Sequence, residues 1–338
     1  MTTHIIDGPL FEDFSIGQVF GAPSVTVTEG YTGLYQAITG DRMRLPLDKE
    51  LSCQVTGDKR ALAHPMLVIN IVNGQTTYAS QNVKGNLFYR GLILKQPVFV
   101  ADTLTTTTKV VGLKQNRLKP GRDATGMVAL EIETKNQNNE IVMKYWRCPM
   151  IPCKQKDADT RKNDDFNWIP ETLSIQDLTS CTDLQWDISL LSDTAFSPLA
   201  PDFLAGDHVI VSGQDTITCA PELVRLTGNI AFAHTDASRS YLKKRLVYGG
   251  QTISLAYAQI MRAMPSTIAL IGWQGCDHLG PVLEEDIIRT EFTITNISQL
   301  EAGGSLYELN VDTYANRLDK NNDYAESKVL NWRLVLWA

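Results

Sequence analysis

The sequence lacks any long apolar segment. None of its apolar runs approaches the ~18 consecutive residues that a membrane-spanning helix requires. Residues 1–7 (MTTHIID) contain neither the basic region nor the apolar core of a secretion signal. These two absences argue against a membrane partner and lead us to expect a cytoplasmic protein.

Cysteine is sparse and never clustered. No pair of cysteines has the two-residue spacing of a zinc knuckle, and metal sites need ligands that cluster in such a pattern. We therefore expect no metal site. Scattered buried thiols are typical of a reducing compartment. The six cysteines are Cys53, Cys148, Cys153, Cys181, Cys219 and Cys276.

Positive charge is in deficit. The chain has 31 Lys and Arg against 38 Asp and Glu, which gives a formal net charge of −7. This balance argues against a nucleic-acid partner, because proteins that bind the phosphate backbone usually present a basic face. A hydrophobic content of 43% and a charged content of 20% are ordinary for a globular protein. The 338 residues suffice for two domains, each with its own core.

The chain carries the same pattern twice. Residues 39–41 (Thr-Gly-Asp) recur 188 positions later as residues 227–229 (Thr-Gly-Asn), and each triplet is followed by an aspartate. Residues 146–147 (Trp-Arg) recur 186 positions later as residues 332–333. Chance matches would not keep their order and spacing in this way, so the pattern indicates a duplication with small insertions.

Both halves predict the same order of elements. A strand and a short helix lead into an irregular loop, and a long apolar segment follows at residues 65–73 and 252–261. Each long segment is apolar on nearly every side, which predicts a buried central helix. The remainder is rich in β-formers, between residues 98 and 146 and between 306 and 335. One helix wrapped by a long antiparallel sheet, twice over, is an α+β architecture.

We expect three parts: an N-terminal domain at residues 1–153, a linker at 154–201 and a C-terminal domain at 202–338. The linker begins with a charged run at 154–162, which predicts an exposed segment. The rest of the linker is expected to lie on the surface of the domains, because it holds four large apolar residues: Trp168, Ile169, Leu173 and Trp186.

A central helix in a curled sheet, preceded by a Thr-Gly-Asp loop, resembles the hot-dog fold of MaoC-like dehydratases and hydratases. In that family the loop reads roughly Gly-Asp-x-Asn-Pro-x-His-x-Asp. The first half matches it at residues 40–41 and at Asp48, and the second half matches it at Gly228, His234 and Asp236. The resemblance covers both halves and implies a tandem, or double, hot-dog fold.

The first residues of the two central helices indicate which members of this family the chain resembles most. The first central helix opens with Ala-His-Pro at residues 63–65, and the second opens with Tyr-Gly-Gly at 248–250. Together with Gly-Asp-Arg at 40–42, the Tyr-Gly-Gly start looks like that of the mesaconyl-CoA hydratases, which are also called β-methylmalyl-CoA dehydratases.

This resemblance implies a hydro-lyase that reversibly hydrates an enoyl-CoA thioester, with mesaconyl-CoA going to β-methylmalyl-CoA. It implies a CoA-thioester substrate and no cofactor, and it allows association into a homodimer. Two alternatives stay open. One is an (R)-specific 2-enoyl-CoA hydratase for unbranched acyl chains, and the other is a hot-dog module that binds acyl-CoA without catalysis.

Hydration needs a base for water, an acid for Cα and donors for the enolate oxygen. The family pattern assigns the proton work to an aspartate and a histidine five positions apart, and neither half keeps both. The first half has Asp41 but Pro46, and the second has His234 but Asn229. We expect His234 to act on the water and Asn229 to orient it, since an amide can position water but cannot take its proton.

Asp41 then either reaches the same cleft from the other half or is a relic. Structural roles are the alternatives, with Asp41 as a turn cap and His234 as a buried, hydrogen-bonded imidazole. The remaining histidines outside these motifs have no partner pattern: His4, His208 and His278.

The substrate-binding residues are expected at the second helix start and among the arginines. Gly249 and Gly250, next to Tyr248, would supply backbone N–H groups to the thioester oxygen, because residues without Cβ allow a close approach. A dicarboxylate substrate also needs a cation, and guanidinium groups bind carboxylates through two hydrogen bonds. Arg42 and Arg90 are our candidates for that cation.

Overall fold

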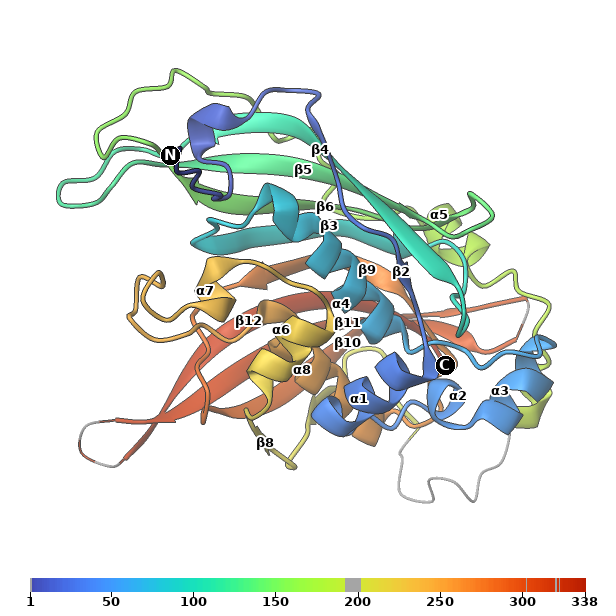
Figure 1. Ribbon diagram of the computed structural model, residues 1–338. Coiled ribbons are helices and arrows are strands. Elements are labelled where there is room, and N and C mark those ends of the chain that lie inside the picture. The colour runs from blue at the N-terminus through green and yellow to red at the C-terminus, as the bar shows by residue number, and fades with distance from the viewer. Residues whose placement is uncertain (1, 192–201, 302, 320, 322) are drawn as a thin grey trace.

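The computed structural model describes residues 2–191, 202–301, 303–319, 321 and 323–338 (Figure 1). Each half has one buried central helix and four long strands. In the first half these are α4 (Pro65–Gln75), β3 (Gly85–Leu94), β4 (Thr103–Gln115), β5 (Thr125–Lys135) and β6 (Ile141–Pro152). In the second half they are α8 (Gly249–Ala263), β9 (Ala269–His278), β10 (Ile287–Gln299), β11 (Ser305–Leu318) and β12 (Tyr324–Trp337).

Shorter elements complete each half. The short strands are β1 (Val19–Gly21), β2 (Val25–Thr26), β7 (His208–Ile210) and β8 (Asp215–Thr216). The other α-helices are α1 (Glu29–Thr39), α2 (Arg44–Leu47), α3 (Lys49–Thr56), α5 (Ile175–Ser180), α6 (Ala220–Leu226) and α7 (Phe232–Thr235). Three 3-10 turns are η1 (Phe11–Asp13), η2 (Thr76–Ala79) and η3 (Ile188–Leu191).

One antiparallel sheet joins the two halves. Among the described residues its strand order is β1-β4-β5-β6-β3-β9-β12-β11-β10-β7, with β2 on β4 and β8 on β10. The halves meet where β3 pairs with β9, at Tyr89 opposite Cys276 and Arg90 opposite Gly275. The predicted α+β class is confirmed, and the two copies share a single curved sheet.

The central helices lie side by side against one face of this sheet (Figure 1). The Asn70 amide of α4 donates a hydrogen bond to Ser254 Oγ of α8 at 2.9 Å. A Cβ on Gly250 would lie 1.9 Å from Asn70 Oδ1, and a Cβ on Gly74 would lie 1.9 Å from the carbonyl oxygen of Thr227. Glycine at 250 therefore allows the two central helices to pack closely, and glycine at 74 allows the end of α6 to approach α4.

Both predicted central helices are present and are longer than their apolar segments. α4 is buried along almost its whole length, and Pro65 stands in its first turn, where the missing N–H leaves no hydrogen bond unmade. α8 starts at Gly249, three residues before the apolar segment. The predicted β-region from residue 98 differs at its start, because the strand begins at Thr103 after a turn in which Asp102 accepts from the Phe99 N–H at 2.8 Å.

The linker packs against the protein through its apolar side chains. Leu178 and Cys181 belong to a second apolar cluster, which includes Trp337 and has Trp186 packed against it. The Trp186 ring stacks on that of Trp337 with centroids 6.1 Å apart, whereas Trp168 is exposed. Residues 192–201 of the predicted linker lie outside the described residues.

Two expectations from composition can be compared with the structure. All six cysteines are unpaired thiols. In the described part of the chain, no helix has the length and apolar character that crossing a membrane would take.

Candidate functional site

A cavity of about 980 Å³ opens at the start of α8. Its wall comes from both halves: η2, β3, β6 and the β4–β5 hairpin on one side, and the α6–α7 loop, α7, α8 and the end of β9 on the other. Cavities of this size hold small-molecule ligands.

The loop after α6 brings Asn229 and His234 into this wall. Gly228 has φ of 64°, a left-handed conformation that ends α6 and turns the chain. Asn229 Oδ1 then accepts the Ala231 N–H at 2.9 Å, which leaves its NH₂ group as a donor. His234 follows in the next short helix, α7.

The contacts of His234 set its tautomer. Its Nδ1 lies 3.0 Å from the carbonyl oxygen of Leu246. A carbonyl can only accept, so Nδ1 carries the proton and Nε2 keeps its lone pair. Removal from bulk water lowers the pKa of His234 to about 4, and the positive charge of Arg147 acts in the same direction. The imidazole is therefore neutral at pH 7 and free to accept a proton.

His278 stands in the same wall, although its sequence neighbourhood suggested no role. A Cβ on Gly249 would lie 2.5 Å from His278 Cε1, so the glycine makes room for this ring. Burial lowers the pKa of His278 to about 4, and the nearby His234 and Arg147 contribute. The sequence held one signal for His278, which is that the two halves differ at this position: the residue 184 positions earlier is Leu94.

The start of α8 forms the inner part of the cavity. Tyr248 precedes the helix and Gly249 is its first residue, and both line the cavity. The first N–H groups of an α-helix have no partner within the helix, and the helix dipole is positive at this end. Gly250 is not part of the wall; its missing side chain serves the contact with Asn70 described above.

Arg147 on β6 lines the cavity and is only 5% exposed. Its Nη1 donates to Thr76 Oγ1 and its Nη2 to Ser80 Oγ, each at 2.6 Å. Its Nε has no hydrogen-bond partner. The sequence contained this residue within the repeated Trp-Arg pair but offered no reason to place it in a site.

The repeated Trp-Arg pair is shifted by one residue between the halves. Arg147 faces the central helices, whereas Arg333 donates to the carbonyl oxygen of Glu171 in the linker. Trp332 is fully buried, while Trp146 is half-buried. A shift of one residue in a strand moves a side chain to the other face of the sheet. The second half therefore has no equivalent of Arg147.

Asp41 lies outside this cavity. It is buried, and its Oδ1 accepts the Met43 N–H at 2.8 Å, as Asn229 accepts the Ala231 N–H in the other half. His64 Nε2 lies 3.1 Å from the same carboxylate oxygen. Asp41 thus caps a turn and contacts a histidine of its own half.

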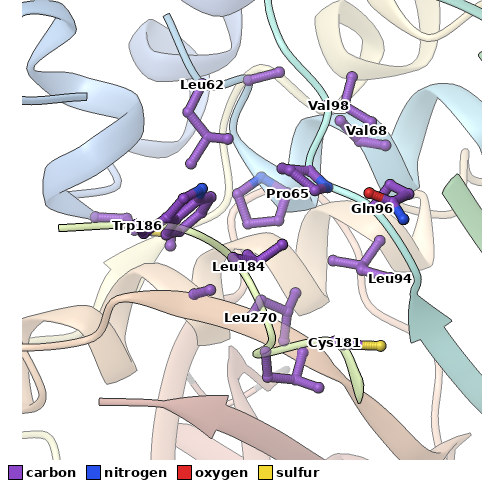
Figure 2. Close-up of a pocket in the computed structure, with 15 residues that line it drawn as sticks. Leu62, Pro65, Val68, Leu94, Gln96, Val98, Cys181, Leu184, Trp186 and Leu270 are labelled. Carbon is purple, nitrogen blue, oxygen red and sulfur yellow. The ribbon is translucent and has the colours of Figure 1, made fainter. Parts of the chain in front are cut away.

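The first half has an equivalent cavity that is almost filled. It measures about 50 Å³ and is lined by apolar residues where the open cavity is polar: Pro65 stands for Gly249 and Leu94 for His278. Figure 2 shows Leu184 and Trp186 of the linker among the side chains that line it. One of the two cavities is therefore large and polar, and the other is nearly filled by the side chains of the protein itself.

The two predicted arginines do not line the open cavity. Arg42 is exposed. Arg90 forms an ion pair with Asp277 at 2.5 Å and lies over the Phe88 ring. Of the residues predicted from sequence, the structure therefore brings four together, namely His234, Asn229, Tyr248 and Gly249.

The mouth of the cavity is basic. Part of its wall is the exposed β4–β5 hairpin with three cations, and a fourth comes from the segment just before β3: Arg117, Lys119, Arg122 and Lys84. This cluster contrasts with the net charge of −7 for the whole chain.

No family model matches the sequence. Two characterised proteins are similar to it over most of its length. β-Methylmalyl-CoA dehydratase of Chloroflexus aurantiacus is 31% identical over 296 residues, which are 83% of this chain and 80% of the relative. Mesaconyl-CoA hydratase of Cereibacter sphaeroides is 27% identical over 294 residues, which are 83% and 82%.

Two solved structures superpose on nearly the whole chain. A conserved hypothetical protein from Mycobacterium tuberculosis with a double hot-dog fold has a TM-score of 0.82 and 36% identity, and 98% of each chain is covered. A putative MaoC domain protein dehydratase from Chloroflexus aurantiacus has a TM-score of 0.81 and 25% identity, with coverage of 99% and 98%. The predicted tandem hot-dog fold is confirmed.

Proposed function

We propose, from the premise that this chain belongs to the MaoC-like double hot-dog hydratases and dehydratases, that it reversibly hydrates an enoyl-CoA thioester of the mesaconyl-CoA type. The proposal rests above all on one observation: a neutral histidine with a free Nε2 stands beside the N-terminus of a long buried helix in a large open cavity.

His234 is the base in this proposal. Its Nε2 takes a proton from water while the water oxygen bonds to Cβ of the enoyl thioester. The π electrons move toward the thioester oxygen. The protonated Nε2 then returns its proton to Cα, so that H and OH are added across the double bond and His234 is neutral again. The NH₂ group of Asn229 orients the water, because it can donate to the water oxygen but cannot take a proton.

The start of α8 holds the thioester oxygen. Negative charge develops on this oxygen as the enolate forms, and the N–H of Gly249 together with the positive end of the helix dipole stabilises it. Tyr248 packs beside His234, with ring centroids 5.5 Å apart, and keeps the imidazole in position.

The basic mouth suits the phosphates of CoA. Lys84, Arg117, Lys119 and Arg122 are cations that bind phosphate oxygens through charge-assisted hydrogen bonds. An acidic chain with cations gathered at one opening draws a polyanionic substrate to that opening.

The test uses the purified protein and mesaconyl-CoA, with the loss of enoyl-thioester absorbance as the signal. We expect turnover, and we expect His234→Ala to reduce it roughly 10²–10⁴-fold, as removal of a general base does. The matched control is His208→Ala, which changes an exposed histidine on β7 and is expected to leave the rate unchanged. No absorbance change at high enzyme concentration would contradict the proposal.

A non-catalytic acyl-CoA-binding module is the second candidate, and the observation in its favour is Asn229, since an amide cannot share the proton work. It predicts binding of the thioester that His234→Ala leaves unaltered and no turnover. An (R)-specific hydratase for unbranched chains would instead hydrate crotonyl-CoA faster than mesaconyl-CoA. A cytoplasmic location, the bounds of the two domains and the linker, and a homodimer stay predictions from the sequence.

A further inference from the structure

Arg147 carries a buried positive charge that no carboxylate of the described residues neutralises. Its hydrogen bonds go to two neutral hydroxyl groups, those of Thr76 and Ser80. A buried ion is costly unless it is paired, so an unpaired guanidinium in a cavity wall indicates a site for an anion. Its buried Nε has no partner either, so the hydrogen-bonding capacity of the guanidinium group is not met within the chain.

The rest of the cavity wall also favours a negatively charged ligand. The acidic residue in the wall is Asp123, which stands on the exposed β4–β5 hairpin and not beside Arg147. His234 and His278 are neutral, so they do not compete for an anion. Nothing in the wall near Arg147 would repel a carboxylate.

The anion that Arg147 binds is distinct from the phosphates of CoA. Three of the four cations at the mouth are exposed and Lys84 is half-buried, whereas Arg147 is almost wholly buried. It lies on the part of the wall formed with η2, at the end of the first central helix. The acyl group, which must reach His234, is the part of an acyl-CoA that enters this depth.

We propose that Arg147, supported by Thr76 and Ser80, binds the free carboxylate of the acyl group and selects dicarboxylate thioesters. The inference rests on the proposed hydration of an enoyl-CoA and deepens it by naming the residue that recognises the substrate. Arg147 takes the place that the sequence suggested for Arg42 and Arg90. The guanidinium group offers the paired donors that a carboxylate requires.

The test compares two thioesters that differ only at the recognised group. Mesaconyl-CoA has a carboxylate on Cβ, and 2-methylcrotonyl-CoA has a methyl group there on the same carbon skeleton. The wild type is expected to favour mesaconyl-CoA in kcat/KM. Arg147→Gln, which removes the charge and the guanidinium group but keeps a polar amide, is expected to lose roughly 10–100-fold on mesaconyl-CoA, mainly through KM, and to keep its rate on 2-methylcrotonyl-CoA.

Two further variants sharpen the comparison. Arg147→Lys keeps the charge and is expected to recover part of the preference. Arg90→Met removes the arginine on the neighbouring strand, which pairs with Asp277 outside the cavity, and is expected to leave the preference as in the wild type. Equal losses on both thioesters in Arg147→Gln would mean that Arg147 only supports the end of α4, and would overturn the proposal. So would a loss of preference in Arg90→Met.

Calorimetric binding separates this inference from the proposed reaction. If the wild type hydrates neither thioester, the proposed function fails. Arg147 recognition then still predicts tighter binding of mesaconyl-CoA than of 2-methylcrotonyl-CoA, with the difference lost in Arg147→Gln. Equal affinities in the wild type would overturn it. If Arg147→Gln does not fold, Arg147→Lys takes its place, and the ratio of its affinities for mesaconyl-CoA and 2-methylcrotonyl-CoA is compared with that of the wild type. An unchanged ratio would count against the proposal, because lysine lacks the guanidinium fork.

Discussion

Gly249 and Gly250 are adjacent, but different neighbours require the absence of a side chain at each position. A Cβ at 249 would meet the ring of His278 in the cavity, and a Cβ at 250 would meet the Asn70 side chain at the helix crossing. Both were expected to contact substrate. The structure divides them into one residue of the site and one residue of the core.

Alanine at the two positions should therefore have different effects. Gly249→Ala pushes His278 away from the start of α8 and is expected to lower kcat/KM roughly 10²-fold, as a misplacement near 1 Å can. Gly250→Ala overpacks the contact between α8 and α4 and is expected to lower the free energy of unfolding by about 1–3 kcal/mol. Enzyme kinetics and chemical denaturation of both variants test this division. Identical profiles for the two would contradict it.

Asp41 and His234 show which features of the site a residue pattern can predict. The sequence located both, along with the exchange of aspartate for asparagine at 229. It could not say whether one cleft holds them, because that depends on how the halves are joined. The partners of Asp41 belong to its own half: the Met43 N–H donates to its carboxylate, and His64 Nε2 lies close to the same oxygen.

At the scale of elements, the linker does more than connect the halves. Its segment around α5 packs into the second apolar cluster, and Leu184 and Trp186 line the nearly filled cavity of the first half (Figure 2). Its apolar residues predicted packing on the surface. Their target was not predictable, because a cavity appears only when the helix and the sheet have come together.

Removal of the packing around Trp186 should lower the free energy of unfolding and leave catalysis unchanged. Trp186→Ala removes a half-buried ring that stacks on Trp337, and we expect the free energy of unfolding to fall by about 2–3 kcal/mol. Trp168→Ala is the matched control, because that ring of the same linker is exposed. Thermal unfolding and hydration assays check both variants. A large loss of hydration activity in folded Trp186→Ala would show that the first-half cavity takes part in the reaction.

At the scale of the whole molecule, the shared sheet makes the halves depend on each other. β3 and β9 pair along the seam, and the open cavity takes its wall from both halves. Two half-buried histidines lie in that wall with pKa values lowered to about 4. Their protonation acts on the contact between the halves and not on one domain alone.

The stability of the chain should fall as the pH is lowered from about 6.5 toward 4. In this window the unfolded chain binds protons at His234 and His278, which have a pKa near 6.5 when solvated, while the folded chain does not. Protonation therefore favours unfolding, and the full contribution is present above pH 6.5. Urea denaturation at pH 7 and pH 5 measures the effect, and His278→Asn is expected to reduce it. Equal pH dependence in that variant would contradict the assignment.

The sequence by itself determined the duplication, the two central helices, the α+β class and the loop that carries Asn229 and His234, because these follow from local order, apolar periodicity and turn-forming glycines. The tertiary structure alone decided that one cavity is open and the other is filled, that His278 and Arg147 join His234, and that Arg42, Arg90 and Asp41 do not. These outcomes depend on strand register and helix crossing, where a shift of one residue turns an arginine from a cavity to the opposite face.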